Sequence, residues 1–324
     1  MAAASDASAT QRSGKGRRPT FSVGLRGQPL GLAAYVKHAD ELGFDGIWAQ
    51  ETLNAANYSL DPLHQLSYAA AVTARLRLGV SVLFSGYRSP AVLARELATI
   101  DQLSQGRLTV GMGVGNAYHR PRLAALGIVT DRPALRLVEG IAVMRALWSR
   151  AEAEFKGEIY SFSGIRSQPK PVQQPSPPIV IGARAEVAVR RAVTIADGWT
   201  GAGMIPPDER AKELAALNSE IAAQGRDRAA FQISVNVYIS VDKDRIRARE
   251  KAQEVFSVGF RNSPVYQAEG MAERVAMLGP PEECAEQMRR LLDQSVDELI
   301  FYPMYDYPNQ LEGIARAVEL VRAR

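Results

Sequence analysis

Two segments of the chain carry residues whose types and order suit chemistry. Glu51 follows the apolar run 45–50, and a carboxylate desolvated there can move a proton or accept a buried hydrogen bond. Asn116 and His119 follow the glycine-rich segment 111–115, which places an amide and an imidazole beside bare backbone. We therefore expect Glu51, Asn116 and His119 to serve in catalysis. The alternative for Glu51 is a carboxylate that caps a loop.

The glycine-rich segment reads GMGVGNAYH from Gly111 onward. A dinucleotide fingerprint needs a third, later glycine, and this segment lacks one, which argues against a Rossmann fold. Glycines here leave a bare backbone that a planar ring can approach closely, although such a motif often only permits close packing or a tight turn.

A third segment suits an anion. Residues 181–186 run from the end of an apolar strand directly into a helix, whose first amides have no partners within the helix. The helix dipole favours negative charge at this end. The amides of residues 183–186 are therefore predicted to cradle a phosphate group. Arg184 can add a charge-assisted contact or can equally be an exposed side chain.

Short β-branched runs alternate with segments of helical period from Thr20 onward, which is typical of parallel strands with crossover helices. The expected strands are 20–25, 45–50, 76–83, 107–114, 178–183, 197–201, 232–241 and 297–303. The expected helices are 32–42, 62–74, 90–103, 133–148, 185–196, 207–223, 244–256 and 310–322. Eight such units predict an α/β fold, a (β/α)8 TIM barrel, with an open doubly wound sheet as the alternative.

Two insertions interrupt the series, before strands five and eight. Residues 151–177 predict a short hairpin and a proline-rich strap, and residues 257–295 predict a polar segment and a helix from about residue 281. Small residues inside the run 76–83 suggest a bulge, with a plain strand end as the alternative. Because the carboxyl ends of barrel strands build the active site, all the segments named above are expected at one mouth.

Composition excludes several classes of function. The chain has 324 residues, one cysteine and three histidines, so disulfide scaffolds and cysteine-based metal centres are excluded, and we expect no metal. The formal net charge is +4, but residues 1–18 carry four basic and one acidic side chain, leaving +1 for the remainder. We expect a disordered tail over 1–18, one domain over 19–324, and neither nucleic-acid nor membrane binding. Without the apolar region of a signal peptide, we expect a cytoplasmic protein.

Several segments, taken in order, resemble the bacterial luciferase-like superfamily. They are GFDGIWAQET, then LRLGVSVLFSGYRSPAVLARELATIDQLSQGRLTVGMGVGNAYHRPRLAALGI, then a helix ending ALW, then F-x-G-x-x-Y-x-F, and then QPKPVQQPSPPIVIGARAEVAVRRAVTIADGW. The resemblance covers the chain from about Phe21 to its end. It implies a barrel oxidoreductase or monooxygenase that uses the deazaflavin coenzyme F420 or FMN, with a small-molecule substrate and a homodimeric assembly.

The resemblance also implies site residues. A cis peptide at Ser81–Val82 would support the cofactor ring from behind, and Gly113, Val114 and Gly115 would lie near the ring or its side chain. The phosphate would be held by Gly182, Ala183, Arg184 and Ala185. Sugar-phosphate and alcohol dehydrogenases of the deazaflavin branch carry His, Trp and Glu where Thr52, Ala56 and Asn116 stand here.

Those departures favour reduction of a carbonyl, imine or activated double bond over alcohol oxidation. We expect F420, because the excess of arginine over lysine suggests a GC-rich genome, with an FMN monooxygenase as the alternative. A barrel that binds a ligand without catalysis is a third possibility. Pocket walls are expected from Phe84, Tyr87, Tyr118 and Phe301, while His38, His64 and Cys284 are expected to be structural.

Overall fold

Eight parallel strands close into a barrel in the computed structural model, which describes residues 18–25, 31–52, 59–115, 120–259 and 270–323. Neighbouring strands are ordered β1-β2-β3-β4-β7-β8-β9-β11, and β11 pairs with β1. The strands are β1 (Thr20–Leu25), β2 (Gly46–Ala49), β3 (Arg77–Phe84), β4 (Leu108–Gly113), β7 (Ile179–Gly182), β8 (Gly198–Gly201), β9 (Gln232–Val241) and β11 (Glu298–Pro303). The predicted TIM barrel is confirmed, and the open sheet is excluded because the ring closes.

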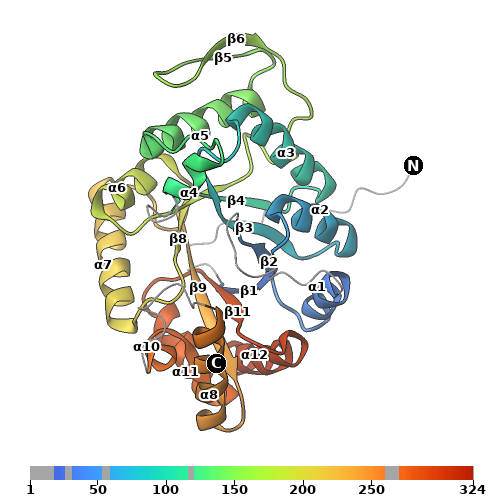
Figure 1. Ribbon diagram of the computed structural model, residues 1–324, viewed down its shortest axis with the longest axis vertical. Coiled ribbons are helices and arrows are strands. Elements are labelled where there is room, and N and C mark those ends of the chain that lie inside the picture. Colours follow the sequence, from blue (N-terminus) through green and yellow to red (C-terminus); the bar gives the residue numbers. More distant parts are fainter. Residues whose placement is uncertain (1–17, 26–30, 53–58, 116–119, 260–269, 324) are drawn as a thin grey trace.

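Helices surround this ring (Figure 1). Those that follow the barrel strands are α1 (Leu32–Glu41), α2 (Pro62–Val72), α3 (Pro90–Leu103), α5 (Pro133–Ser149), α6 (Glu186–Ile195), α7 (Pro207–Ala223), α8 (Arg245–Gly259) and α12 (Tyr307–Arg322). Proline stands in the first turn of α2, α3, α5 and α7, where its missing N–H costs no helical hydrogen bond. No helix within the described ranges is both long and apolar enough to cross a membrane.

The first insertion is a hairpin of β5 (Ala153–Lys156) and β6 (Ser161–Ile165), as predicted. It lies outside the ring of helices, next to α5 (Figure 1). Glu139 of α5 anchors it, because its carboxylate accepts hydrogen bonds from three backbone amides of the turn, at 2.8, 3.0 and 3.1 Å. These bonds, despite opposing burial, lower the pKa of Glu139.

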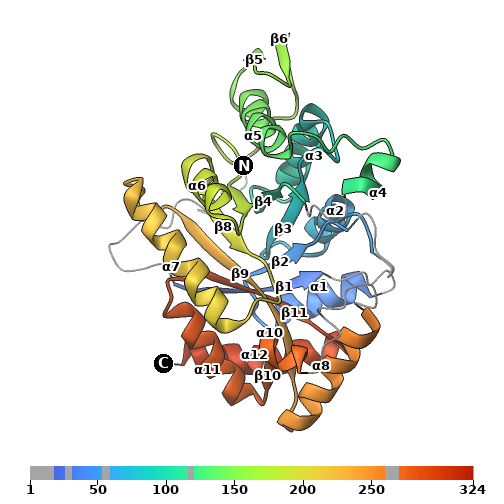
Figure 2. The same ribbon diagram turned by 60° about the vertical axis from the view of Figure 1, so that its left-hand side comes forward.

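The second insertion contains α10 (Met271–Val275), β10 (Met277–Gly279) and α11 (Pro281–Leu292). In Figure 2 these elements gather with α8 and α12 at one side of the barrel. The sequence predicted α11 but missed β10, which pairs with the last residues of β9, and also missed α4 (Arg120–Ala125). The expected tail 1–18 lies outside the described residues apart from Arg18.

The strands are buried on both faces. Outward residues such as Leu78 and Val80 of β3 pack in the layer between the barrel and its helices. Inside the barrel, large side chains lie over glycines. A Cβ added at Gly79 would lie 2.3 Å from the Trp48 ring, and one at Gly24 would lie 2.0 Å from Tyr302. The barrel is therefore filled up to its carboxyl end, where the site begins.

Candidate active site

The carboxyl end of β3 departs from regular geometry at the mouth of the barrel. The peptide bond between Ser81 and Val82 is cis, as the resemblance implies. The register with β4 shifts between Val80 and Leu83, which is the expected bulge.

The glycines of β4 and β7 accommodate this bulge. A Cβ at Gly113 would lie 2.8 Å from Val82 Cγ2, and one at Gly182 would lie 3.2 Å from Val82 Cγ1. At Gly111 the obstacle is the backbone itself, since a Cβ would lie 2.0 Å from the Val80 carbonyl oxygen. Part of the glycine pattern therefore reflects close packing within the barrel wall.

Polar side chains join opposite walls of the barrel at the height of the bulge. Asn236 Nδ2 of β9 donates a hydrogen bond to Ser81 Oγ at 3.0 Å, and Thr200 Oγ1 of β8 lies 3.3 Å from the same hydroxyl. All three residues are buried. We call Ser81, Thr200 and Asn236 the polar layer, and it forms a floor beneath the mouth. Sequence reasoning missed Thr200 and Asn236, although Ser234, Asn236 and Ser240 recur on one face of an apolar strand, which is a signal.

The segment after β4 borders a small cavity. Gly115 has a φ of +73°, and a Cβ there would lie 3.5 Å from the Phe84 ring. The Phe84 and Tyr87 rings meet edge to face with centroids 5.1 Å apart. The cavity is lined by Ser85, Tyr87, Val114, Gly115, Leu123, Ile128, Val129, Thr130 and Pro133. The expected catalytic residues Asn116 and His119, and the expected wall residue Tyr118, lie outside the described residues.

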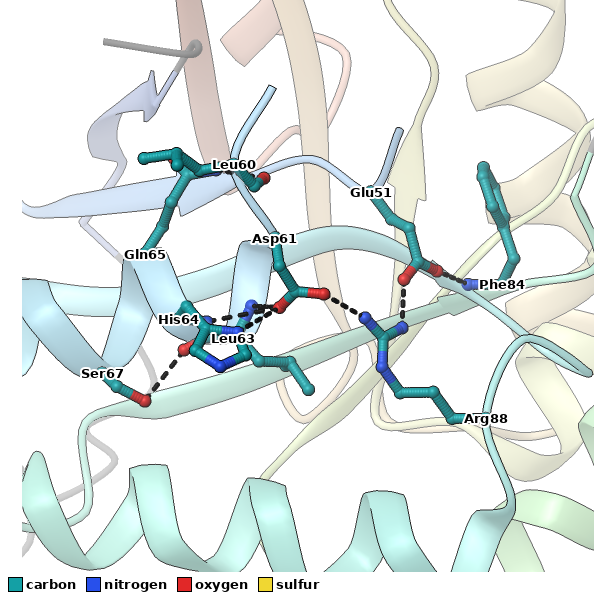
Figure 3. Close-up of polar contacts among 9 residues, drawn as sticks. All are labelled: Glu51, Leu60, Asp61, Leu63, His64, Gln65, Ser67, Phe84 and Arg88. Atoms are coloured by element: carbon teal, nitrogen blue, oxygen red, sulfur yellow. Dashed lines mark hydrogen bonds and ion pairs between the residues drawn. The ribbon is translucent and has the colours of Figure 1, made fainter. Parts of the chain in front are cut away.

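Glu51 is buried in a network of charges (Figure 3). Its Oε2 accepts a hydrogen bond from the Phe84 amide at 2.7 Å, and its Oε1 pairs with the Arg88 guanidinium. Arg88 Nη2 also donates to Asp61 Oδ2 at 2.5 Å. Burial raises the pKa of Glu51, and the bonds from Arg88 and Phe84 oppose that shift.

The predicted strand-to-helix junction lies between β7 and α6. Ala185 is the N-cap of α6 and has no side-chain capping bond. Arg184 points to α7, where its Nε donates to Glu213 Oε1 at 2.6 Å and its Nη2 lies 3.3 Å from Glu209 Oε2. Its charge is thus already matched by two carboxylates of α7.

One predicted wall residue is wrong. Phe301 is fully buried and stacks on Phe21 at 6.4 Å in the layer between barrel and helices. Its neighbours Ile300 and Tyr302 face the barrel interior instead. Because strands alternate their side chains, Phe301 points away from the mouth.

The remaining reactive side chains lie apart from the mouth. His64 Nδ1 lies 3.1 Å from Asp61 Oδ1 at the start of α2, and His38 lies on α1 beside Glu41 and Glu312. Cys284 is buried in α11, and burial raises the pKa of its thiol to about 12, as expected for an inert residue. Within the described part of the chain, no three His, Cys, Asp or Glu side chains are grouped as metal ligands.

Comparisons with known proteins give a consistent picture. Residues 18–298 match the sequence profile of the family described as luciferase-like monooxygenase. A 5,10-methylenetetrahydromethanopterin reductase from Archaeoglobus fulgidus is 33% identical over 246 residues, which cover 75% of this chain and 70% of that protein. An F420-dependent glucose-6-phosphate dehydrogenase from Kineococcus radiotolerans is 27% identical over 300 residues, covering 85% and 87%.

Solved structures share the fold. An F420-dependent secondary alcohol dehydrogenase, in complex with an F420–acetone adduct, superposes with a TM-score of 0.80 at 18% identity and covers 94% of this chain and 99% of its own. The long-chain alkane monooxygenase LadA superposes with a TM-score of 0.77 at 13% identity, covering 94% and 92%. At such identities the likeness concerns the fold.

Proposed function

Since the chain belongs to the luciferase-like monooxygenase family, we propose that this oxidoreductase uses coenzyme F420 to exchange a hydride with a small organic substrate. A carbonyl, an imine or an activated carbon–carbon double bond is the substrate class. The observation that carries this proposal is the packing of Gly182, three residues before the N-cap of α6, against Val82 at the bulge of β3, which supports a phosphate site and a ring site next to each other. Similar proteins named for F420 support the choice of cofactor.

The residues at the junction fit a cofactor that carries a phosphate. At α2 the N-cap Asp61 satisfies the amides of residues 63 and 64 with its own carboxylate. At α6 the N-cap Ala185 has no side-chain acceptor, as at several other helices, and its carbonyl oxygen accepts from the Ala188 amide at 2.8 Å, so the amides of residues 186 and 187 are the ones proposed to bind an anion. Gly182 is the last residue of β7 and packs beside Val82. The predicted phosphate site and the predicted ring site are therefore proposed to be adjacent.

The chain's own residues then have distinct tasks. Amides at the start of α6 would bind the phosphate, and Val82 with Gly113, Val114 and Gly115 would set the plane of the ring. The polar layer closes the barrel beneath and keeps bulk water from entering below. Bound deazaflavin supplies the hydride chemistry, while the protein orients it. Asn116 and His119 stay predictions for contacts with the ring edge and for a proton source.

The second candidate is an FMN-dependent monooxygenase, which the family description and the fold of the alkane monooxygenase support. Fluorescence titration of the purified protein with oxidised and reduced F420 and with FMN separates the two. We expect micromolar affinity for F420. Affinity for FMN alone would favour the monooxygenase, and affinity for neither would favour a barrel that binds some other ligand.

Placing a negative charge at Gly182 tests the phosphate site. We expect Gly182→Asp to weaken F420 binding by at least about tenfold relative to Gly182→Asn, about 1.4 kcal/mol, because the carboxylate repels the phosphate. Gly182→Asn is the matched control, since it crowds Val82 to the same degree without a charge. Titration of both variants measures the difference. Equal affinities would place the phosphate elsewhere.

A further inference from the structure

Both oxygens of the Glu51 carboxylate are engaged within the chain. Oε2 accepts from the Phe84 amide, and Oε1 is paired with Arg88 (Figure 3). The side chain of Glu51 is 4% exposed and that of Arg88 is 21% exposed. Two partners that hold both oxygens within the chain suit an anchor better than a group that must exchange a proton with a substrate. The geometry thus gives Glu51 a different task from the catalytic one that its position in the sequence predicts.

Arg88 joins two segments that the barrel brings to the same edge. Arg88 lies between β3 and α3, whereas Glu51 follows β2 and Asp61 is the N-cap of α2. Asp61 uses Oδ1 to cap α2, accepting from the Leu63 amide at 2.9 Å, and offers Oδ2 to Arg88 at 2.5 Å. A guanidinium suits this arrangement because its planar fork can serve two carboxylates at once.

The Phe84 amide connects this ion-pair network to the proposed cofactor site. Phe84 is the last residue of β3, two positions after Val82. Its ring lies under Gly115, and its backbone follows the register shift against β4. A hydrogen bond that holds the Phe84 amide in place therefore fixes the position at which the bulge ends. It also fixes the Phe84 ring on which Gly115 packs.

We propose that Arg88 is a positioning residue that holds Glu51 as an anion against the Phe84 amide, so that Glu51 anchors the end of β3 and transfers no proton. The part of this proposal that concerns cofactor binding and turnover rests on the proposed function. The part that concerns the Phe84 amide does not.

The surrounding charges support this role. The groups that act on Glu51 are Arg88 and Tyr87 from the segment after β3 and Asp61 from the start of α2, with His64 bonded to Asp61. Only Arg88 is a strong cation among them. Without it, burial and the negative charge of Asp61 both raise the pKa of Glu51 further, and the amide loses its charge-assisted acceptor when the carboxyl is protonated.

Hydrogen exchange at the Phe84 amide tests the anchor without any ligand. We expect Arg88→Met to speed exchange at Phe84 by at least about tenfold, after correction for intrinsic rates. The loss should be greatest at low pH, where the unpaired Glu51 is protonated, and should shrink as the pH rises and the carboxylate again offers the amide a charged acceptor. Arg88→Lys should recover part of the protection, and it serves if Arg88→Met does not fold. Arg166→Met, which breaks the exposed pair with Glu152, should leave Phe84 unchanged. Unchanged exchange in both Arg88 variants overturns the proposal.

Turnover tests whether Glu51 moves a proton. We expect Glu51→Gln to keep the wild-type pH profile of kcat and to lose less than about tenfold in kcat, because an amide oxygen can still accept from Phe84. A fall of more than about 100-fold with a lost limb of the pH profile is the signature of a proton-transfer group and overturns the proposal. If the wild type binds no cofactor, the proposed function fails, while the exchange experiment still decides the role of Arg88.

Discussion

Alanine at Gly111 is expected to lower the free energy of unfolding by about 3 kcal/mol or more, the largest loss among the wall glycines around the bulge of β3. The added Cβ would lie 2.0 Å from the Val80 carbonyl oxygen. That atom belongs to the backbone of β3, which is paired with β4 in a closed ring, so neither strand can move aside without breaking hydrogen bonds. A flexible side chain at the same distance would cost less.

Urea unfolding measures this loss, and two further variants bracket it. Gly113→Ala meets Val82 Cγ2 at 2.8 Å, and because a side chain can turn, we expect a smaller loss. Gly140 lies inside α5 with Pro90 Cβ at 3.7 Å as its nearest neighbour, so Gly140→Ala should stabilise by about 0.5–1 kcal/mol. A Gly111→Ala protein as stable as the wild type would refute the packing role of this glycine.

The glycine motif showed in the sequence that something approaches the backbone closely, but not which group does. The spacing G-x-G-x-G was compatible with a ring or with close packing of the chain. In the structure, Gly111 and Gly113 also make room for Val80 and Val82 of the neighbouring strand. Which group approaches a bare backbone depends on strand order and register, and these follow from closure of the whole barrel.

The barrel itself was predictable from local patterns. Each of the eight strands begins and ends within one residue of its expected bounds, because β-branched runs are flanked by polar or glycine residues. The face of each residue was harder to predict. Strands buried on both faces lose their polar alternation, and so Phe301 was assigned to the mouth although it packs against Phe21.

Partners distant in sequence escaped prediction for the same reason. Ser81 and Asn236 are 155 residues apart, and Glu51 and Arg88 are 37 apart. No helical or strand period connects such pairs. Their contact exists only once the barrel brings their strands to the same height, which is why the type of Glu51 was noticed and its ion pair was not.

Alanine at Glu298 is expected to destabilise the amino end of the barrel by about 2–4 kcal/mol. The Glu298 carboxylate is buried there and accepts from Ser22 Oγ at 2.6 Å, Trp48 Nε1 at 2.9 Å and Gln232 Nε2 at 2.8 Å. Alanine leaves these three donors without that acceptor and adds a cavity. Urea unfolding at neutral pH measures the loss, and a change below about 0.5 kcal/mol would contradict it.

Glutamine at the same position separates the hydrogen bonds from the charge. Burial raises the pKa of Glu298 in the folded protein, despite the bonds from Ser22 and Trp48. The folded state therefore holds this proton more tightly than the unfolded state does. The stabilisation that comes from this tighter proton binding is fully present below the pKa of about 4.5 that Glu298 has in the unfolded chain. It is lost as the pH rises through the higher pKa of Glu298 in the folded protein.

The glutamine of Glu298→Gln does not titrate, and its amide oxygen can accept from Ser22 and Trp48. Its NH2 group can donate to Gln232 once the Gln232 amide rotates to present its oxygen. The free energy of unfolding of this variant should therefore rise relative to that of the wild type as the pH rises above about 4.5. Unfolding of both proteins across this range gives the difference. If the difference in free energy of unfolding between the two proteins stays constant with pH, Glu298 has the same pKa in the folded and unfolded states. The hydrogen bonds from the three donors would then offset the whole cost of burying its charge.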